Sequence, residues 1–126
     1  MKVNSYRDLI GWQKSMELTT IIYTLVKQLP KDEQFGLSLQ MKRAVVSIPS
    51  NIAEGQSRHS TKEYIHFLTI ARGSKSELET QLLICQNLQY LPNNIVLSTL
   101  ELVEEVGRLI NHYINELTQK IRGGSC

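Results

Sequence analysis

Apolar residues recur at steps of three and four positions through most of the chain, which is the spacing of an amphipathic α-helix. The first such stretch begins at Asp8, a candidate N-cap, and ends before Pro30, because the residue that precedes a proline disfavours helical geometry. Its apolar positions form two adjacent stripes, which are Leu9, Trp12, Met16, Tyr23 and Val26, and beside them Leu18, Ile22, Leu25 and Leu29. The pattern predicts a first helix over residues 8–29 with a wide apolar face.

The same periodicity predicts a second helix over residues 32–55, with Gly55 as a natural C-terminal stop. Pro49 lies inside this helix, where it removes one backbone hydrogen bond and its ring clashes with the carbonyl of Val45. We therefore expect a kink at this position. The freed polar groups have three candidate partners nearby, which are Ser47, Ser50 and Asn51.

A third helix is predicted over residues 60–89 and a fourth over residues 94–122. The third has the clearest start, because Ser60 and Glu63 have the spacing of a capping box. Pro92 marks the turn between the third and fourth helices. Helices joined by such short connections pack antiparallel to their neighbours.

The predicted fold is therefore an all-α, antiparallel up-down-up-down four-helix bundle that forms a single domain over residues 1–126. Two glycines lie inside predicted helices, where each costs about 1 kcal/mol relative to alanine. Folding the last two helices about the turn brings Gly73 and Gly107 within about one helical turn of the same level. We expect a close backbone approach there, and the alternative is room for a ligand or a partner chain.

The composition fits a single domain of this size and does not indicate any other class of protein. A chain of 126 residues with 41% apolar residues can bury one core. We expect no membrane span, since no stretch approaches about 18–20 consecutive apolar residues, and no signal peptide, so the expected location is the cytoplasm. The two cysteines share no motif: Cys85 is expected to be a small buried hydrophobe, and Cys126 to lie in a frayed tail.

Motifs that carry catalytic chemistry are scarce. Glu63 and His66 have the Glu-x-x-His spacing of di-iron bundles, but the second copy that such a site needs is missing, because Leu109 stands three residues before His112. Glu63 is also accounted for by the capping box. The remaining histidines share no spacing with a nucleophile, and no phosphate-binding glycine loop is present. We therefore expect no enzyme activity, no metal site and no cofactor.

Positive charge is concentrated in one part of the chain. Between residues 42 and 75 there are six basic and two acidic residues, so this segment carries +4, and the rest, by difference from the total of +2, carries −2. Folding the second and third helices about a turn near Ser57 places Arg43 at the level of Arg72. The candidate nucleic-acid-binding residues are the six cations Lys42, Arg43, Arg58, Lys62, Arg72 and Lys75. They could contact phosphates, whereas base readout is disfavoured without interleaved aromatics; the alternative is an ordinary solvated basic face.

One stretch resembles a known family. Residues 47–58 read SIPSNIAEGQSR, which is similar to the signature of the four-helix-bundle family named for proteins encoded in intervening sequences of bacterial large-subunit ribosomal RNA genes, also described as ribosomal-protein-like. Other matching stretches are LIGWQK at residues 9–14, EQFGL and QMKRA in the second helix, and KEY, FL and ARGS in the third. The resemblance covers roughly residues 8–115.

The resemblance implies a four-helix bundle that assembles into a ring, with a pentamer as the implied form. It also implies similarity in fold to the accessory proteins of diversity-generating retroelements, which are basic pentamers that bind nucleic acid and a reverse transcriptase. Five copies would multiply the charge of the basic segment. Apolar residues in excess of one bundle's core would then form the interface, for which the candidate is the stripe Leu18, Ile22, Leu25 and Leu29.

We therefore expect a non-enzymatic, ring-forming bundle whose partners are further copies of itself and RNA or another nucleic acid. The alternative is a protein-interaction scaffold that binds a polypeptide and no nucleic acid. No membrane partner is expected.

Overall fold

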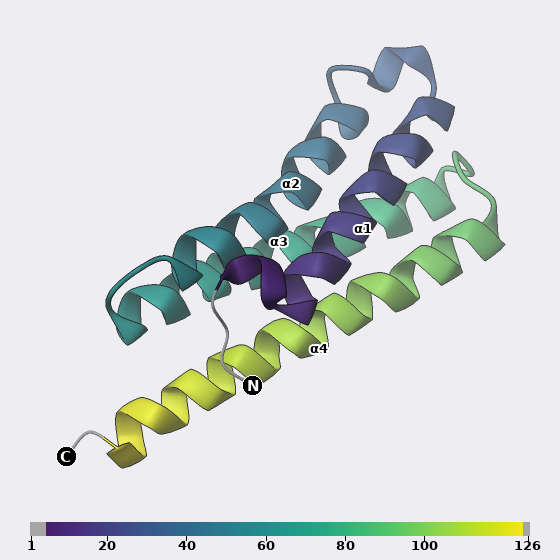
Figure 1. Cartoon of the computed structure of the whole chain (residues 1–126). Coiled ribbons are helices and arrows are strands. Elements are labelled where there is room, and N and C mark those ends of the chain that lie inside the picture. The colour runs from purple at the N-terminus through teal and green to yellow at the C-terminus, as the bar shows by residue number, and fades with distance from the viewer. Residues whose placement is uncertain (1–4, 125–126) are drawn as a thin grey trace.

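Residues 5–124 of the chain are described by a computed structural model (Figure 1). They form four long α-helices, α1 (Ile10–Leu25), α2 (Leu37–Gln56), α3 (Thr61–Asn87) and α4 (Asn93–Gly124). The described residues also contain three short 3-10 helices: η1 (Tyr6–Asp8) before α1, and η2 (Val26–Gln28) and η3 (Lys31–Glu33) between α1 and α2. These residues contain no β-strand, so the prediction of an all-α fold with four helices is confirmed.

Each helix packs against the next one in the sequence, and α1 also packs against α4, so the four helices surround one core (Figure 1). The contact between α2 and α3 is the most extensive. The core is apolar and combines side chains from all four helices, among them Leu18, Ile22, Met41, Ile48, Leu68, Leu78, Val103 and Ile110. Within the described residues, no helix combines the length and apolar character that crossing a membrane requires.

The apolar stripe of α1 that was predicted to form an interface lies in the core instead. Leu18 and Ile22 are fully buried, and Leu25 and Leu29 nearly so. The other stripe contains the exposed positions: the Met16 side chain is 42% exposed and that of Tyr23 is 40% exposed. The prediction of the interface stripe was therefore wrong, because two stripes of equal spacing lie side by side on α1 and the fold buries the more aliphatic one.

The predicted start of the second helix is also corrected. A 3-10 turn, η3, occupies the expected first turn, and α2 begins only at Leu37. Gly36 is its N-cap residue and has no side chain to accept a hydrogen bond. The Glu33 carboxylate takes this role from outside the helix, because its Oε1 accepts the Leu37 N–H at 3.1 Å. The predicted N-cap of the first helix was also wrong: the N-cap of α1 is Leu9, whereas Asp8 is the last residue of η1.

The predicted third-helix cap is confirmed in part, since the Ser60 side chain accepts the Glu63 N–H at 3.3 Å. Gly55, in contrast, does not end α2, which continues to Gln56. It is buried where α2 meets α3, and an added Cβ would come within 3.0 Å of side-chain atoms of both Tyr64 and Phe67. This glycine is therefore needed for packing between helices.

The expected pairing of Gly73 with Gly107 is not found. Gly73 is exposed, and an added Cβ would meet nothing within 4 Å. Gly107 is buried, but the group that covers it is the side chain of Lys75, whose Cε would lie 2.9 Å from an added Cβ. The absence of a side chain at Gly107 makes room for an aliphatic lysine stem, and the two backbones do not approach at a glycine pair.

Pro49 is buried within α2, and the helix is continuous through it. The carbonyl that loses its partner is that of Val45, four residues earlier. The Thr19 hydroxyl of α1 reaches this carbonyl oxygen at 3.4 Å, in addition to a 2.8 Å hydrogen bond to Ser15 O in its own helix. Two of the expected local partners bond elsewhere, since Asn51 Nδ2 donates to Ser47 O and to Ser47 Oγ.

Candidate nucleic-acid interface

The six candidate cations lie on different sides of the bundle. Lys42 points toward α1, with its Nζ 5.4 Å from the ring centroid of Tyr23. Arg72 and Lys75 point toward α4: Arg72 Nη1 donates to Asn111 Oδ1 at 3.1 Å, and Lys75 covers Gly107. The structure therefore does not bring the six cations together into one stripe.

The register between α2 and α3 explains part of this separation. Ser74 Oγ donates to Ser47 Oγ at 2.8 Å, which sets these two residues at the same level. Counting outward in antiparallel helices, Arg43 lies opposite Leu78, about six residues or 9 Å along the axis from Arg72. The prediction that Arg43 and Arg72 share a level was wrong, because the turn is centred nearer residue 60 than Ser57.

Two of the cations lie at the tip of the α2–α3 hairpin. The Arg58 guanidinium is 2.7 Å from the Glu54 carboxylate and 4.8 Å from the ring centroid of Phe67. Lys62 is exposed in the first turn of α3, where the helix dipole adds partial positive charge. Glu54 lies in the last turn of α2 and Glu63 in the first turn of α3. The tip therefore has two carboxylates beside its two cations, and one of those cations, Arg58, is held in a fixed orientation.

The remaining cations differ in how available they are. Arg43 is exposed, and no ion pair to it occurs within residues 5–124. The Lys75 side chain is only 17% exposed, and its Nζ lies 3.6 Å from the Glu79 carboxylate. Arg43, Arg58 and Lys62 are more exposed than Lys75 and are for that reason better placed to meet a phosphate.

The Glu63 and His66 pair lies on the exposed side of α3. Within the described residues, no group of three or more histidine, cysteine or acidic side chains is arranged to hold a metal ion. His112 is 3.8 Å from Glu116 on its own helix. Burial raises the pKa of the Cys85 thiol to about 11, with a smaller contribution from Glu33, so this buried cysteine is a protonated thiol at neutral pH. Cys126 lies outside the described residues.

Two tyrosines also have raised pKa values. Burial, and then the neighbouring Tyr113, raise the pKa of Tyr64 to about 12. The pKa of Tyr90 is raised first by the hydrogen bond that its hydroxyl donates to Glu33 Oε2 at 2.9 Å. Both groups are part of the packing between elements.

A surface that the sequence did not reveal lies between α1 and α2. Three adjoining hollows of about 350, 460 and 340 Å³ follow the groove between these helices and share Thr19, Tyr23 and Val46. We call this groove the α1–α2 furrow; its other lining residues include Tyr6, Trp12, Met16, Pro49, Leu39, Lys27, Lys42 and Arg43. The apolar stripe that contains Met16 and Tyr23 is visible in the sequence, but its helical spacing is also the pattern of a core-facing stripe.

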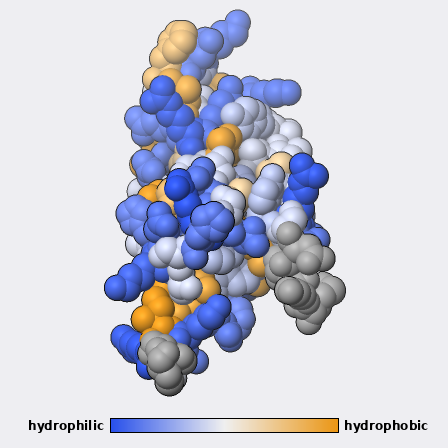
Figure 2. Space-filling view, turned by 60° about the vertical axis from the view of Figure 1, so that its left-hand side comes forward, coloured by the Kyte–Doolittle hydropathy of each residue, from blue (hydrophilic) through white to orange (hydrophobic). Residues whose placement is uncertain are grey.

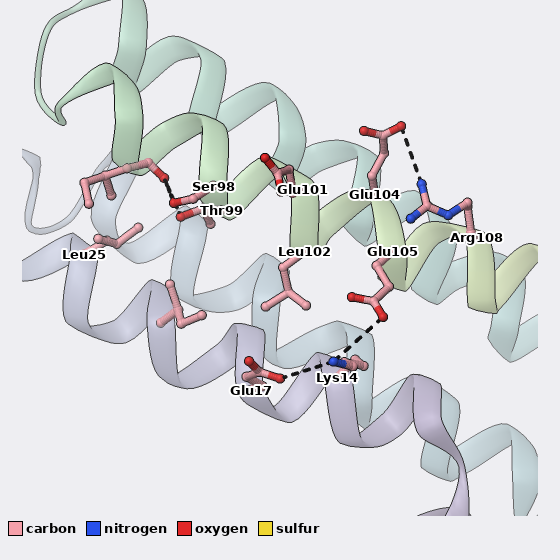
Figure 3. Close-up of a pocket in the computed structure, with 12 residues that line it drawn as sticks. Lys14, Glu17, Leu25, Ser98, Thr99, Glu101, Leu102, Glu104, Glu105 and Arg108 are labelled. Atoms are coloured by element: carbon pink, nitrogen blue, oxygen red, sulfur yellow. Dashed lines mark hydrogen bonds and ion pairs between the residues drawn. The ribbon is translucent and has the colours of Figure 1, made fainter.

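A second hollow, of about 640 Å³, lies between α1 and α4 (Figure 3). We call it the α1–α4 hollow. Lys14 lies between two carboxylates, 3.9 Å from Glu17 and 3.8 Å from Glu105, and Arg108 is 3.8 Å from Glu104. With Glu101, the lining has four carboxylates and two cations, so this face is acidic. On the face drawn in Figure 2, hydrophobic residues appear as separate patches between hydrophilic ones.

This chain is similar to known proteins over most of its length. The sequence profile described as 23S rRNA-intervening sequence protein matches residues 7–112. Among solved structures, the chain is similar to a protein of unknown function from the S23 ribosomal protein family of Bacteroides thetaiotaomicron. The two sequences are 27% identical, the TM-score is 0.78, and the match covers 83% of this chain and 98% of that one. No curated protein sequence matches this chain.

Proposed function

Because this chain belongs to the 23S rRNA-intervening sequence protein family, as its motifs predict, we propose that it is a non-enzymatic bundle that assembles into a ring and binds RNA through phosphate contacts. The family name, which refers to ribosomal RNA, supports the RNA part of this proposal. The proposed bundle has helices of alternating direction and a kink at Pro49. The short connections, and the contacts between helices that follow each other in sequence, support the alternating directions.

The observation that carries the RNA proposal is the position of Arg58 at the hairpin tip. Its guanidinium rests on Phe67 and beside Glu54, so it loses little side-chain freedom when it meets a phosphate. Lys62 lies close by at the positive end of α3. Charge-assisted contacts of this kind fix a backbone without reading its bases.

Ring formation strengthens this argument. A single chain carries only +2, which is too little for strong electrostatic attraction. Repetition of the hairpin tip around a ring presents several cationic tips to one polyanion, and their contacts add through effective concentration. The proposed RNA is therefore bound by an assembly, with little dependence on its sequence.

A protein-interaction scaffold is the second candidate, and a specific observation favours it. Phe35, in the connection between η3 and α2, has an 83% exposed side chain, and Tyr23 and Val46 are also exposed. Exposed aromatic and apolar groups of this kind are typical of protein contacts.

RNA binding is tested by a salt titration with a short fluorescent RNA. We expect the logarithm of the affinity to fall linearly with the logarithm of the salt concentration, and the double variant Arg58→Glu, Lys62→Glu to bind about tenfold more weakly or worse. The matched control is Lys31→Glu, Lys120→Glu, which makes the same change in net charge outside the basic segment. Equal loss in both double variants would assign binding to net charge alone, and no RNA binding by the unmodified chain would favour the scaffold.

A further inference from the structure

The α1–α2 furrow and the α1–α4 hollow have opposite electrostatic character. Among the described residues, the furrow is lined by three cations, Lys27, Lys42 and Arg43, and by no acidic residue. The hollow is lined by four carboxylates and two cations, so it has two negative charges in excess. Opposite potentials on two surfaces of one chain are the condition for those surfaces to attract each other between copies.

The two surfaces are also complementary in their apolar groups. In the furrow, Met16, Tyr23 and Val46 are each about 40% exposed, which leaves an apolar strip that adjoins the cations at one end. On the other face, Leu97 is 56% exposed and lies one helical turn before Glu101, on the same side of α4. An exposed leucine beside carboxylates matches an apolar strip beside cations.

We propose that the α1–α2 furrow of one copy receives the α1–α4 face of a second copy. This inference rests on the ring formation proposed above, and identifies the surfaces that make it. In this interface the carboxylates of Glu101 and Glu104 face Lys27 and Arg43 of the neighbouring copy, and Leu97 packs against its Tyr23 and Val46. The contact is heterologous, because one copy contributes its furrow and the other copy contributes its α1–α4 face.

The position of α1 in both faces makes this contact compatible with a closed ring. Both faces include α1, so they lie on neighbouring sides of the bundle and not on opposite sides (Figure 1). Each added copy is therefore rotated relative to the previous one, whereas opposite faces would build a straight filament. A heterologous contact with a constant rotation produces a ring when the rotation closes.

The interface and the proposed RNA contact use different residues. Lys42 and Arg43 belong to the furrow, which assigns them to assembly and leaves Arg58 and Lys62 at the hairpin tip for phosphate. RNA binding and self-association can therefore be disturbed separately.

The test uses native mass spectrometry on two variants of the full chain. The furrow variant is Lys27→Glu, Val46→Glu, and the acidic-face variant is Glu101→Lys, Glu104→Lys. The substituted side chains are exposed, so the fold is expected to persist. The matched control for the charge change of the acidic-face variant is Glu77→Lys, Glu116→Lys, which changes exposed carboxylates away from the hollow.

We expect the unmodified chain and the control to keep the mass of the ring, and each face variant alone to be a monomer. An equimolar mixture of the two face variants is expected to form complexes of unlike chains, beginning with a dimer, because it contains one intact furrow and one intact acidic face. This rescue also shows that both variants are folded.

Three results would overturn the inference. If the face variants keep the ring mass, a ring exists but uses other surfaces. If one face variant still dimerises with itself, the contact is isologous. If the unmodified chain is a monomer, ring formation and this inference fail together, while RNA binding at Arg58 and Lys62 can still be measured.

Discussion

The backbone N–H of Gly11 donates a 2.8 Å hydrogen bond to the hydroxyl of Tyr113, although the two residues are 102 positions apart. Gly11 lies in the first turn of α1, where backbone N–H groups have no partner inside the helix. An added Cβ at Gly11 would lie only 2.7 Å from Tyr113 Cε2. The absence of a side chain at Gly11 and the hydroxyl of Tyr113 thus together close the contact between α1 and α4.

The Tyr113→Phe variant is expected to lower the free energy of unfolding by about 1 kcal/mol, the usual net value of one hydrogen bond. Gly11→Ala is expected to cost about 1–3 kcal/mol, because its methyl group displaces the Tyr113 ring. Urea unfolding followed by circular dichroism measures both changes. Tyr23→Phe is the control, since the Tyr23 ring is exposed; an equal loss in the control would contradict the assignment.

Glu33 connects three parts of the fold through one carboxylate. Its Oε1 accepts the Leu37 N–H at the start of α2, and its Oε2 accepts the hydroxyl of Tyr90 from the connection between α3 and α4. The Glu33→Ala variant is expected to lose about 1–3 kcal/mol of unfolding free energy, because both donors lose a charged acceptor. Asp32→Ala, at the neighbouring exposed position, is the control, and a similar loss there would exclude a specific role for Glu33.

The raised pKa of Tyr64 predicts a dependence of stability on alkaline pH. Its pKa is about 12 in the folded chain, against about 10 when unfolded, so the folded state holds this proton more tightly. The stabilisation is fully present below pH 10 and is lost as the pH rises toward 12. Chemical unfolding between these pH values is expected to show a shallower decline in Tyr64→Phe.

Cys85 and Tyr90 have pKa values raised in the same direction, so part of the decline should remain in Tyr64→Phe. A decline that is unchanged in this variant would exclude Tyr64 as a source. The matched control is Tyr6→Phe, a substitution of the same kind outside the contact between α2 and α3.

The contact from Thr19 to the Val45 carbonyl predicts a coupling with Pro49. Thr19→Val removes the hydroxyl and is expected to cost about 0.5–1 kcal/mol of unfolding free energy. In a Pro49→Ala background the residue at position 49 has its own N–H for that carbonyl, so the same substitution is expected to cost less. A double-mutant cycle measures the difference. Equal costs in both backgrounds would mean that Thr19 acts only through its bond to Ser15 O.

The number and order of the helices could be predicted because period, capping box and proline positions agree along the chain. The faces of α1 could not, since Met16 and Leu18 belong to stripes with the same spacing, and the choice between them is made by packing against α2 and α4. The start of α2 was missed because its cap comes from Glu33 through space and not from a side chain at the N-cap.

The candidate site was predictable only as a set of residue types. Charge counting found the basic segment, and the structure divides it because helical register depends on where the turn is centred. The Ser47–Ser74 contact marks that register, and neither serine signals its partner in the sequence. The α1–α2 furrow was hidden for a similar reason, since it is formed by exposed positions on two helices that meet only in the folded chain.

The bond between Gly11 and Tyr113 also bears on the order in which the chain folds. The most extensive helix contact joins α2 and α3, which are separated by a connection of only a few residues, so little loop entropy opposes its formation. Joining Gly11 to Tyr113 requires closure of a loop that spans most of the chain. We therefore expect the docking of α1 onto α4 to be a late event, so that its loss accelerates unfolding while the rate of refolding stays nearly unchanged.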